Sequence, residues 1–127
     1  MTYAGDLTPA QAFELVRDDP AAVLVDVRTR EEWDQVGVPD LSELGKQVIF
    51  LEWQQGPQRR PNPDFLSELA VAVPEGAPVV MICRSGVRSV ASADAATAAG
   101  IAPSYNVLEG FEGRSGWQRS GLPWGHR

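Results

Sequence analysis

The segment from residue 77 to residue 100, APVVMICRSGVRSVASADAATAAG, constrains the fold more than any other part of the chain. Residues 78–82 form a short apolar run rich in Val and Ile, which is typical of a buried strand. Residues 90–99 are Ala-rich strong helix formers, and the following Gly100 suits a left-handed helix C-cap. Cys83 and a short loop lie between the two runs. The segment predicts a strand, a tight loop and a helix in direct succession.

The rest of the chain repeats this alternation of short apolar runs and helical segments. Helices are predicted at residues 9–17, 29–34 and 63–71, and strands at residues 22–27, 47–53 and 104–108. Residues 54–63 form the only loop-rich stretch of any length. Strands that alternate with helices predict an α/β fold, with a central parallel β-sheet and helices on both faces. We expect residues 1–127 to form a single domain.

Composition excludes several classes of function. The chain has 11 Lys and Arg residues against 17 Asp and Glu residues, a net charge of −6 that argues against nucleic acid as a partner. A single cysteine excludes an internal disulfide and a Cys-only metal cluster, and no metal or cofactor is expected. The N-terminus does not resemble a signal peptide, and no apolar run approaches the roughly 18 residues of a membrane span. A cytoplasmic location is the default expectation.

The one cysteine lies at a position that favours chemistry. A thiol at the carboxyl end of a strand faces the first turn of the next helix, where unpaired N–H groups and the helix dipole favour a thiolate and bind anions. Gly86 can supply a positive φ, while Arg84 and Arg88 add positive charge. A lone cysteine that ends a strand is more often a small buried apolar residue. The loop that follows Cys83 favours the functional interpretation, a cradle for an anion with a sulfur nucleophile at its floor.

The spacing within the loop separates two kinds of chemistry. Cysteine-dependent phosphatases need a cysteine, five residues and then an arginine that clamps a tetrahedral oxyanion. In this chain the sixth residue after Cys83 is Ser89, and Arg88 comes one residue too early. The shorter loop predicts a narrower pocket that suits one sulfur atom better than a phosphate. A phosphatase or arsenate reductase is therefore the less favoured alternative.

The sequence Cys-Arg-Ser-Gly-Val-Arg-Ser at residues 83–89 resembles the active-site loop of the rhodanese-like sulfurtransferases. The resemblance implies a rhodanese-like fold in which Cys83 is the catalytic nucleophile. It also implies that Arg84 steers an anionic donor and that the loop supplies backbone donors. The implied active-site and substrate-binding loop consists of Arg84, Ser85, Gly86, Val87, Arg88 and Ser89.

Residues 24–33, LVDVRTREEW, are similar to the other half of the signature of that family. The resemblance implies that Asp26 lies beside the cysteine loop and pairs with one of its arginines, Arg84 or Arg88. It also implies that Arg28 helps to hold the neighbouring loop. The alternative is that Asp26 only caps the turn at Thr29.

Three further residues are candidates for the rim of the pocket. Arg59 and Arg60 in the 54–63 loop could close over a bound anion, although an exposed basic pair is more often simply solvated. Trp53 at the entrance of this loop could line the mouth of the pocket, although core packing is the commoner role for a tryptophan at a strand end.

The resemblance implies transfer of a sulfane sulfur from thiosulfate or a related donor to cyanide or a thiol, through a persulfide on Cys83. The implied partners are a small anionic sulfur donor and a thiophilic acceptor, and a homodimer is left open. The only histidine, His126, is next to the C-terminus, so backbone dipoles and arginines must activate the thiol in place of a general base. The other alternative is a noncatalytic rhodanese-like binding module, which usually lacks the cysteine.

Overall fold

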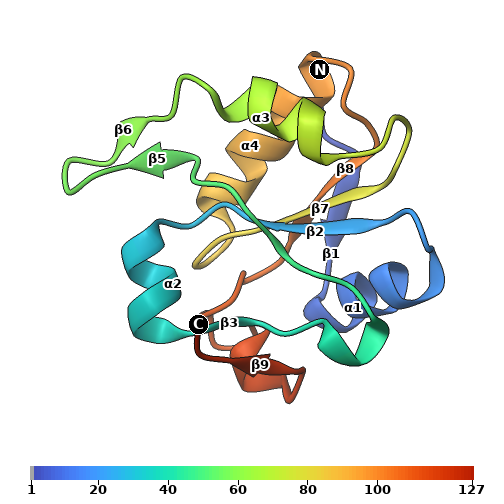
Figure 1. The fold of residues 1–127 in the computed structure, drawn as a ribbon. Coiled ribbons are helices and arrows are strands. Elements are labelled where there is room, and N and C mark those ends of the chain that lie inside the picture. The colour runs from blue at the N-terminus through green and yellow to red at the C-terminus, as the bar shows by residue number, and fades with distance from the viewer. Residues whose placement is uncertain (1) are drawn as a thin grey trace.

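A computed structural model describes residues 2–127, and its centre is a five-stranded sheet in the order β1-β8-β7-β2-β4 (Figure 1). All four pairs of neighbouring strands are parallel. The strands are β1 (Gly5–Leu7), β2 (Val23–Asp26), β4 (Ile49–Phe50), β7 (Val79–Ile82) and β8 (Ser104–Val107). The predicted central parallel sheet is confirmed.

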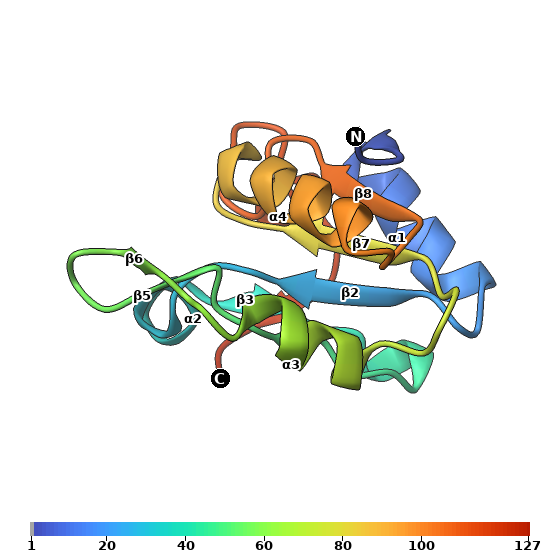
Figure 2. The same cartoon turned by 90° about the horizontal axis from the view of Figure 1, so that it is seen from above.

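Helices cover both faces of this sheet, as predicted. The helices are α1 (Pro9–Asp18), α2 (Arg30–Val36), α3 (Phe65–Ala72) and α4 (Val87–Ala98). Figure 1 shows α3 and α4 above the sheet and α1 below it, and from above α4 lies on the β7–β8 side while α3 lies towards β2 (Figure 2). Phe65 and Leu69 of α3 share one buried cluster with Ala93 and Ala96 of α4. Ala12 and Val16 of α1 belong to a second cluster on the other face.

Capping boxes lie at the start of the first two predicted helices. Thr8 accepts a hydrogen bond from the N–H of Gln11, and the Gln11 side chain accepts one from the N–H of Thr8. Thr29 and Glu32 exchange the same pair of hydrogen bonds at the start of α2. Each box satisfies two backbone donors that the helix itself cannot satisfy. The second box also fixes the Glu32 side chain next to the loop that precedes α2.

Several element boundaries differ from the predictions. The strand predicted at residues 47–53 is reduced to the two residues of β4, because this segment lies at the sheet edge and pairs with β2 alone. The 54–63 loop contains a short antiparallel hairpin of β5 (Gln54–Gln55) and β6 (Arg60–Pro61). Asn62 accepts from the N–H of Asp64 in a turn, so α3 begins only at Phe65. The N-terminal strand β1 was not predicted.

The C-terminal segment closes the molecule against the chain that follows α2. Strand β3 (Val38–Pro39) pairs antiparallel with β9 (Trp124–Gly125). Two 3-10 turns, η1 (Ser42–Leu44) and η2 (Gln118–Ser120), complete the secondary structure. Within residues 2–127 none of the helices has the length and apolar character that crossing a bilayer requires.

Candidate active site

Cys83 directly follows β7, at the same carboxyl edge of the sheet where β2 ends. Ile82 and Asp26 are register partners in the parallel pair β7–β2, which places Asp26 next to the residue before Cys83. The N–H of Gly86 donates to the Cys83 sulfur at 3.1 Å, and the Ser89 oxygen lies 3.1 Å from the same sulfur. The structure therefore brings the predicted nucleophile together with two residues of the predicted loop.

The loop is tighter than the sequence predicts. Gly86 has a left-handed φ of 108° and is the N-cap of α4, so the helix begins at Val87, three residues before the predicted start. The first N–H groups of a helix have no partner inside it, and here they face the loop. We expected several backbone amides around the thiol, but among the described residues the backbone donor to the sulfur is Gly86 alone. Only 1% of the Cys83 surface is exposed, so side chains and loop backbone cover the sulfur.

A second segment, residues 111–112, supports the loop through backbone hydrogen bonds. The N–H of Phe111 donates to the carbonyl of Cys83 at 2.8 Å, and the N–H of Glu112 donates to the carbonyl of Arg84 at 2.9 Å. Arg84 has an exposed side chain, with its Nε 3.6 Å from Glu112 Oε1. Arg84 is therefore the accessible cation of the loop, whereas its backbone is held in place.

Arg88, the second arginine of the loop sequence, is not free. Its guanidinium donates to both carboxylate oxygens of Glu32, at 2.7 and 2.9 Å. Burial would lower the pKa of Arg88, but the Glu32 carboxylate and the nearby Cys83 raise it above its usual value. Arg59 reaches the same carboxylate, with its Nη2 3.5 Å from Glu32 Oε1. Glu32 is therefore in contact with two arginines at the edge of the loop.

The predicted pairing of Asp26 with Arg84 or Arg88 is wrong. Asp26 accepts from Arg28, with Nη2 at 2.7 Å from Oδ2 and Nε at 3.0 Å from Oδ1. The backbone N–H of Arg28 also donates to Asp26 Oδ1 at 3.1 Å, so a local turn already brings the two side chains together. Both side chains are fully buried, and the two arginines of the cysteine loop contact Glu112 and Glu32 instead.

Arg28 joins the end of β2 to two neighbouring segments. Its Nη2 donates to the carbonyl of Gly37 at 2.8 Å, and its Nη1 lies 3.6 Å from Glu112 Oε2. The guanidinium stacks on the Phe111 ring, with its carbon 4.3 Å from the ring centroid. The structure therefore places Arg28 as a support of the segment that in turn supports the Cys83 loop.

The three rim candidates have different positions. Trp53 packs edge-on against Phe65, with ring centroids 4.9 Å apart, so its contact is with the core. Arg59 approaches the loop through Glu32, as described above. Arg60 is exposed in β6, on the outer part of the hairpin.

Glu32, Glu112 and Asn106 were not among the predicted site residues. The position of Glu32 three residues after Thr29 indicates a capping box. That pattern explains its local hydrogen bonds with Thr29 but not its contact with Arg88. Asn106 lies in the buried strand β8 and accepts from Ser89 at 2.6 Å. The sequence around Asn106 does not mark this role, because the same strand also contains Ser104 and Tyr105. Within residues 2–127, no three His, Cys, Asp or Glu side chains converge to hold a metal ion.

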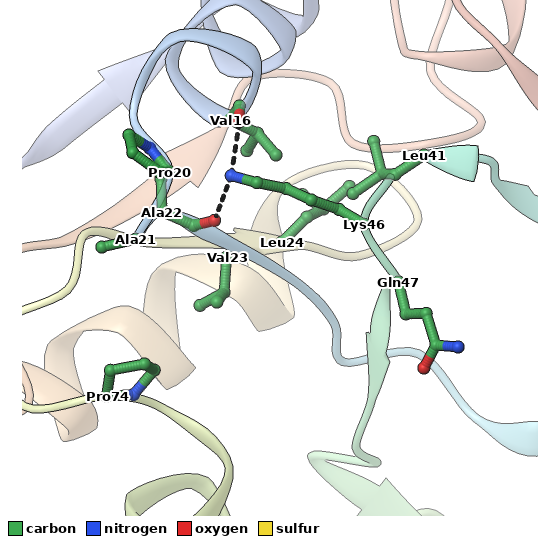
Figure 3. Close-up of a pocket in the computed structure, with 10 residues that line it drawn as sticks. All are labelled: Val16, Pro20, Ala21, Ala22, Val23, Leu24, Leu41, Lys46, Gln47 and Pro74. Atoms are coloured by element: carbon green, nitrogen blue, oxygen red, sulfur yellow. Dashed lines mark hydrogen bonds between the residues drawn. The ribbon is translucent and has the colours of Figure 1, made fainter. Parts of the chain in front are cut away.

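A cavity of about 230 Å³ lies far from this loop, at the amino end of β2 (Figure 3). Because β2 and β7 are parallel, this end of the sheet is opposite the carboxyl edge that carries Cys83. The charged side chain in the cavity wall is Lys46, whose ammonium donates to the carbonyls of Val16, Asp19 and Ala22. The lysine is fully used in closing the end of α1, so this cavity is not part of the candidate active site.

Comparison with known proteins gives matches over nearly the whole chain. A family described as the STR4 middle domain matches residues 5–127. Uncharacterized protein RC0915 of Rickettsia conorii is 40% identical over 124 residues, which cover 94% of this chain and 95% of that protein. The chloroplastic protein THYLAKOID RHODANESE-LIKE of Oryza sativa subsp. indica is 32% identical over 122 residues. That match covers 94% of this chain and 25% of the rice protein.

Two solved structures have the same arrangement of elements. The crystal structure of Rv0390 from M. tuberculosis has a TM-score of 0.92 and 50% identity, covering 99% of this chain and 100% of that chain. The solution structure of the 30 kDa polysulfide-sulfur transferase homodimer from Wolinella succinogenes has a TM-score of 0.73 and 24% identity. It covers 96% of this chain and 78% of that chain, and at this identity it supports the fold alone.

Proposed function

The chain belongs to the rhodanese-like domain family, and from this premise we propose that it is a sulfurtransferase that carries a sulfane sulfur on Cys83. The observation that carries the proposal is the position of the thiol: Cys83 directly follows β7, accepts the N–H of Gly86 and faces the first turn of α4. Backbone donors and a helix N-terminus favour a sulfur anion over a neutral thiol. The exposed Arg84 adds an accessible positive charge beside it.

The first half-reaction loads the sulfur. The Cys83 thiolate attacks the outer sulfur of thiosulfate, a new S–S bond forms, and the bond between the two sulfurs of thiosulfate breaks. Sulfite leaves with the bonding electron pair, and the persulfide on Cys83 keeps one negative charge. Because sulfite departs without a proton, the step needs no general acid. Arg84 attracts the dianionic donor, and the N–H of Gly86 stabilises the developing anion.

The second half-reaction unloads the sulfur. Cyanide or a thiolate attacks the outer sulfur of the persulfide, the S–S bond breaks, and the electron pair returns to Cys83 as thiolate. With cyanide the product is thiocyanate. Donor and acceptor therefore react in turn at one atom, which predicts double-displacement kinetics. Because Cys83 is almost fully buried, we expect the largely exposed loop residues 84–87 to move when the donor enters.

Mass spectrometry of the intact protein tests the proposal. Incubation with thiosulfate should add one sulfur atom, about 32 Da, and cyanide should then remove it. Cys83→Ser should take up no sulfur, and thermal unfolding should show that this variant is folded. Sulfur uptake by Cys83→Ser, or its absence from the wild type with thiosulfate and with polysulfide, would overturn the proposal.

The same samples separate the two alternatives. A cysteine-dependent phosphatase would hydrolyse a phosphate ester such as p-nitrophenyl phosphate and would lose this activity in Cys83→Ser. The loop between Cys83 and Arg88 is one residue short for that chemistry. A binding module would retain thiosulfate or a partner without any change in the mass of the protein. Either result in place of the sulfur adduct would replace the proposed function.

A further inference from the structure

A chain of hydrogen bonds connects Cys83 to the protein surface at β1. The Ser89 hydroxyl lies 3.1 Å from the Cys83 sulfur and donates to Asn106 Oδ1 at 2.6 Å. Asn106 Nδ2 donates to Asp6 Oδ1 at 3.0 Å, and the Tyr3 hydroxyl donates to the same Asp6 oxygen at 2.7 Å. Ser89 and Asn106 are buried, whereas Asp6 is exposed.

The charge on Asp6 determines which group donates and which accepts in every hydrogen bond of this series. Hydrogen bonds from Asn106 and from Tyr3 hold the pKa of Asp6 below its usual value, so Asp6 is a carboxylate at neutral pH and can only accept. The amide group of Asn106 must therefore turn its NH2 towards Asp6 and its oxygen towards Ser89. The single hydroxyl hydrogen of Ser89 then goes to Asn106. The Ser89 oxygen is left as an acceptor for the S–H of Cys83.

We propose that Asn106, oriented by Asp6, is a positioning residue that draws the Ser89 hydrogen away from Cys83 and so restrains the thiol in its protonated form. This inference rests on the proposed use of Cys83 as the nucleophile. When Cys83 ionises, a hydrogen-bond donor stabilises the negative charge on its sulfur. The Ser89 hydroxyl can supply this donor only if it rotates away from Asn106 and towards the sulfur. Asn106 Oδ1 then loses its donor in a site where only 3% of the residue is exposed. An unpaired buried acceptor is costly in free energy, so this chain of hydrogen bonds opposes ionisation of Cys83.

The charged groups around the Cys83 loop are not members of this chain of hydrogen bonds. Arg88 is paired with Glu32, Arg28 with Asp26, and Arg84 faces Glu112. The N–H of Gly86 donates to the sulfur in either protonation state. A change at Asp6 or Asn106 thus alters the hydrogen that Ser89 can offer and leaves these groups in place.

The test measures the rate of Cys83 alkylation by iodoacetamide as a function of pH, followed by intact mass. Asp6→Asn retains the shape of the side chain but can donate as well as accept, so Asn106 can reverse its amide and the Ser89 hydrogen becomes available to the thiolate. We expect the midpoint of the alkylation profile to move down by about one pH unit, as for one added hydrogen bond to a charged group. Asn106→Ala removes the competing acceptor and should shift the midpoint in the same direction.

Two controls make the outcome specific. Asp18→Asn makes the same change of charge on an exposed carboxylate of α1 and should leave the profile at its wild-type position. Ser89→Ala removes the hydroxyl through which Asp6 and Asn106 act on the thiol. Asp6→Asn combined with Ser89→Ala should therefore have the same midpoint as Ser89→Ala alone. An unshifted profile in Asp6→Asn and Asn106→Ala, or a further downward shift when Asp6→Asn is added to Ser89→Ala, would overturn the inference. Because alkylation needs no sulfur donor, these outcomes are independent of whether thiosulfate loads Cys83.

Discussion

Arg88 and Glu32 form a two-point ion pair that joins the start of α4 to the start of α2. The nitrogen–oxygen distances are 2.7 and 2.9 Å, and the two side chains are only 11% and 12% exposed. Arg88 belongs to the first turn of α4, and Glu32 is fixed by the capping box with Thr29. The ion pair therefore ties the helix that positions the thiol to a helix that follows the neighbouring strand.

This ion pair predicts a loss of stability in acid. Burial alone would raise the pKa of Glu32, but the hydrogen bonds from Arg88 and Thr29 lower it to about 2. Since the folded-state pKa lies below the ordinary value of 4.5, the stabilisation is complete above pH 4.5 and is lost as the pH falls towards 2. We expect the wild type to lose about 1 kcal/mol from this group between about pH 6 and about pH 3, because solvent screens a partly exposed pair.

Urea unfolding at the two pH values, compared with Glu32→Gln, measures this contribution. The variant should be less stable at the higher pH and should lose less stability on acidification, because the amide side chain that replaces the carboxylate has no proton to gain. Equal losses in the two proteins would show that Glu32 does not carry the effect.

A buried ion pair at the end of β2 gives a second prediction. Asp26 and Arg28 are both fully buried, and Asp26→Asn would leave Arg28 with the more distant Glu112, at 3.6 Å, as its counter-ion. We expect a loss of about 3 kcal/mol in the free energy of unfolding. Thermal unfolding measures the change, and Asp18→Asn, in an exposed pair with Arg17, serves as the control with little effect. A melting temperature for Asp26→Asn equal to that of the control would contradict a structural role for the buried pair.

Local patterns in the sequence were sufficient to predict most of the fold. The helix starts at Thr8 and Thr29 and the apolar runs that form β2 and β7 depend on neighbours in the chain, and the structure agrees with them. The strand β1 was missed because its three residues, Gly-Asp-Leu, have no apolar pattern. They form a strand only because they pair with β8, which is far away in the sequence.

The partners within the site were less predictable than its residues. The sequence placed Cys83 and Asp26 at the same edge of the sheet, and the structure agrees. It did not reveal the ion pairs, because several arginines and carboxylates compete at that edge and only side-chain geometry decides among them. Arg88 reaches Glu32 on α2, while Asp26 is already satisfied by Arg28 two residues away. Long-range hydrogen bonds such as Ser89 to Asn106 leave no periodic trace in a sequence.

Gly110 gives a third prediction, because it lies against the backbone of the Cys83 loop. A methyl group at this position would come within 2.7 Å of the carbonyl carbon and oxygen of Arg84 and would also meet the carbonyl oxygen of Cys83. These are backbone atoms that cannot move without the loop. Gly110→Ala should therefore displace the loop, lower stability by more than about 1 kcal/mol and change the rate of Cys83 alkylation.

Gly45→Ala is the matched control for that variant. Gly45 has a similar left-handed φ, 69° against 55° for Gly110, but within residues 2–127 no atom beyond its chain neighbours lies within 4 Å of an added methyl group. Gly45→Ala has only the conformational cost of an alanine at positive φ, and it should leave the alkylation of Cys83 unchanged. If both variants alkylate at the wild-type rate, the close approach of Gly110 does not position the loop.

Lys46 gives the last prediction, at the opposite end of the sheet (Figure 3). Its ammonium donates to the carbonyls of Val16, Asp19 and Ala22, at 2.6, 2.8 and 3.0 Å, and so closes the C-terminal end of α1 and the turn into β2. Lys46→Met keeps the apolar stem and removes all three hydrogen bonds. We expect a loss of about 2 kcal/mol and faster amide hydrogen exchange in the last turn of α1. Alkylation of Cys83 should keep its wild-type pH profile, because the lysine lies at the far edge of the sheet, and unchanged exchange in α1 would show that the three contacts do not hold this end of the helix.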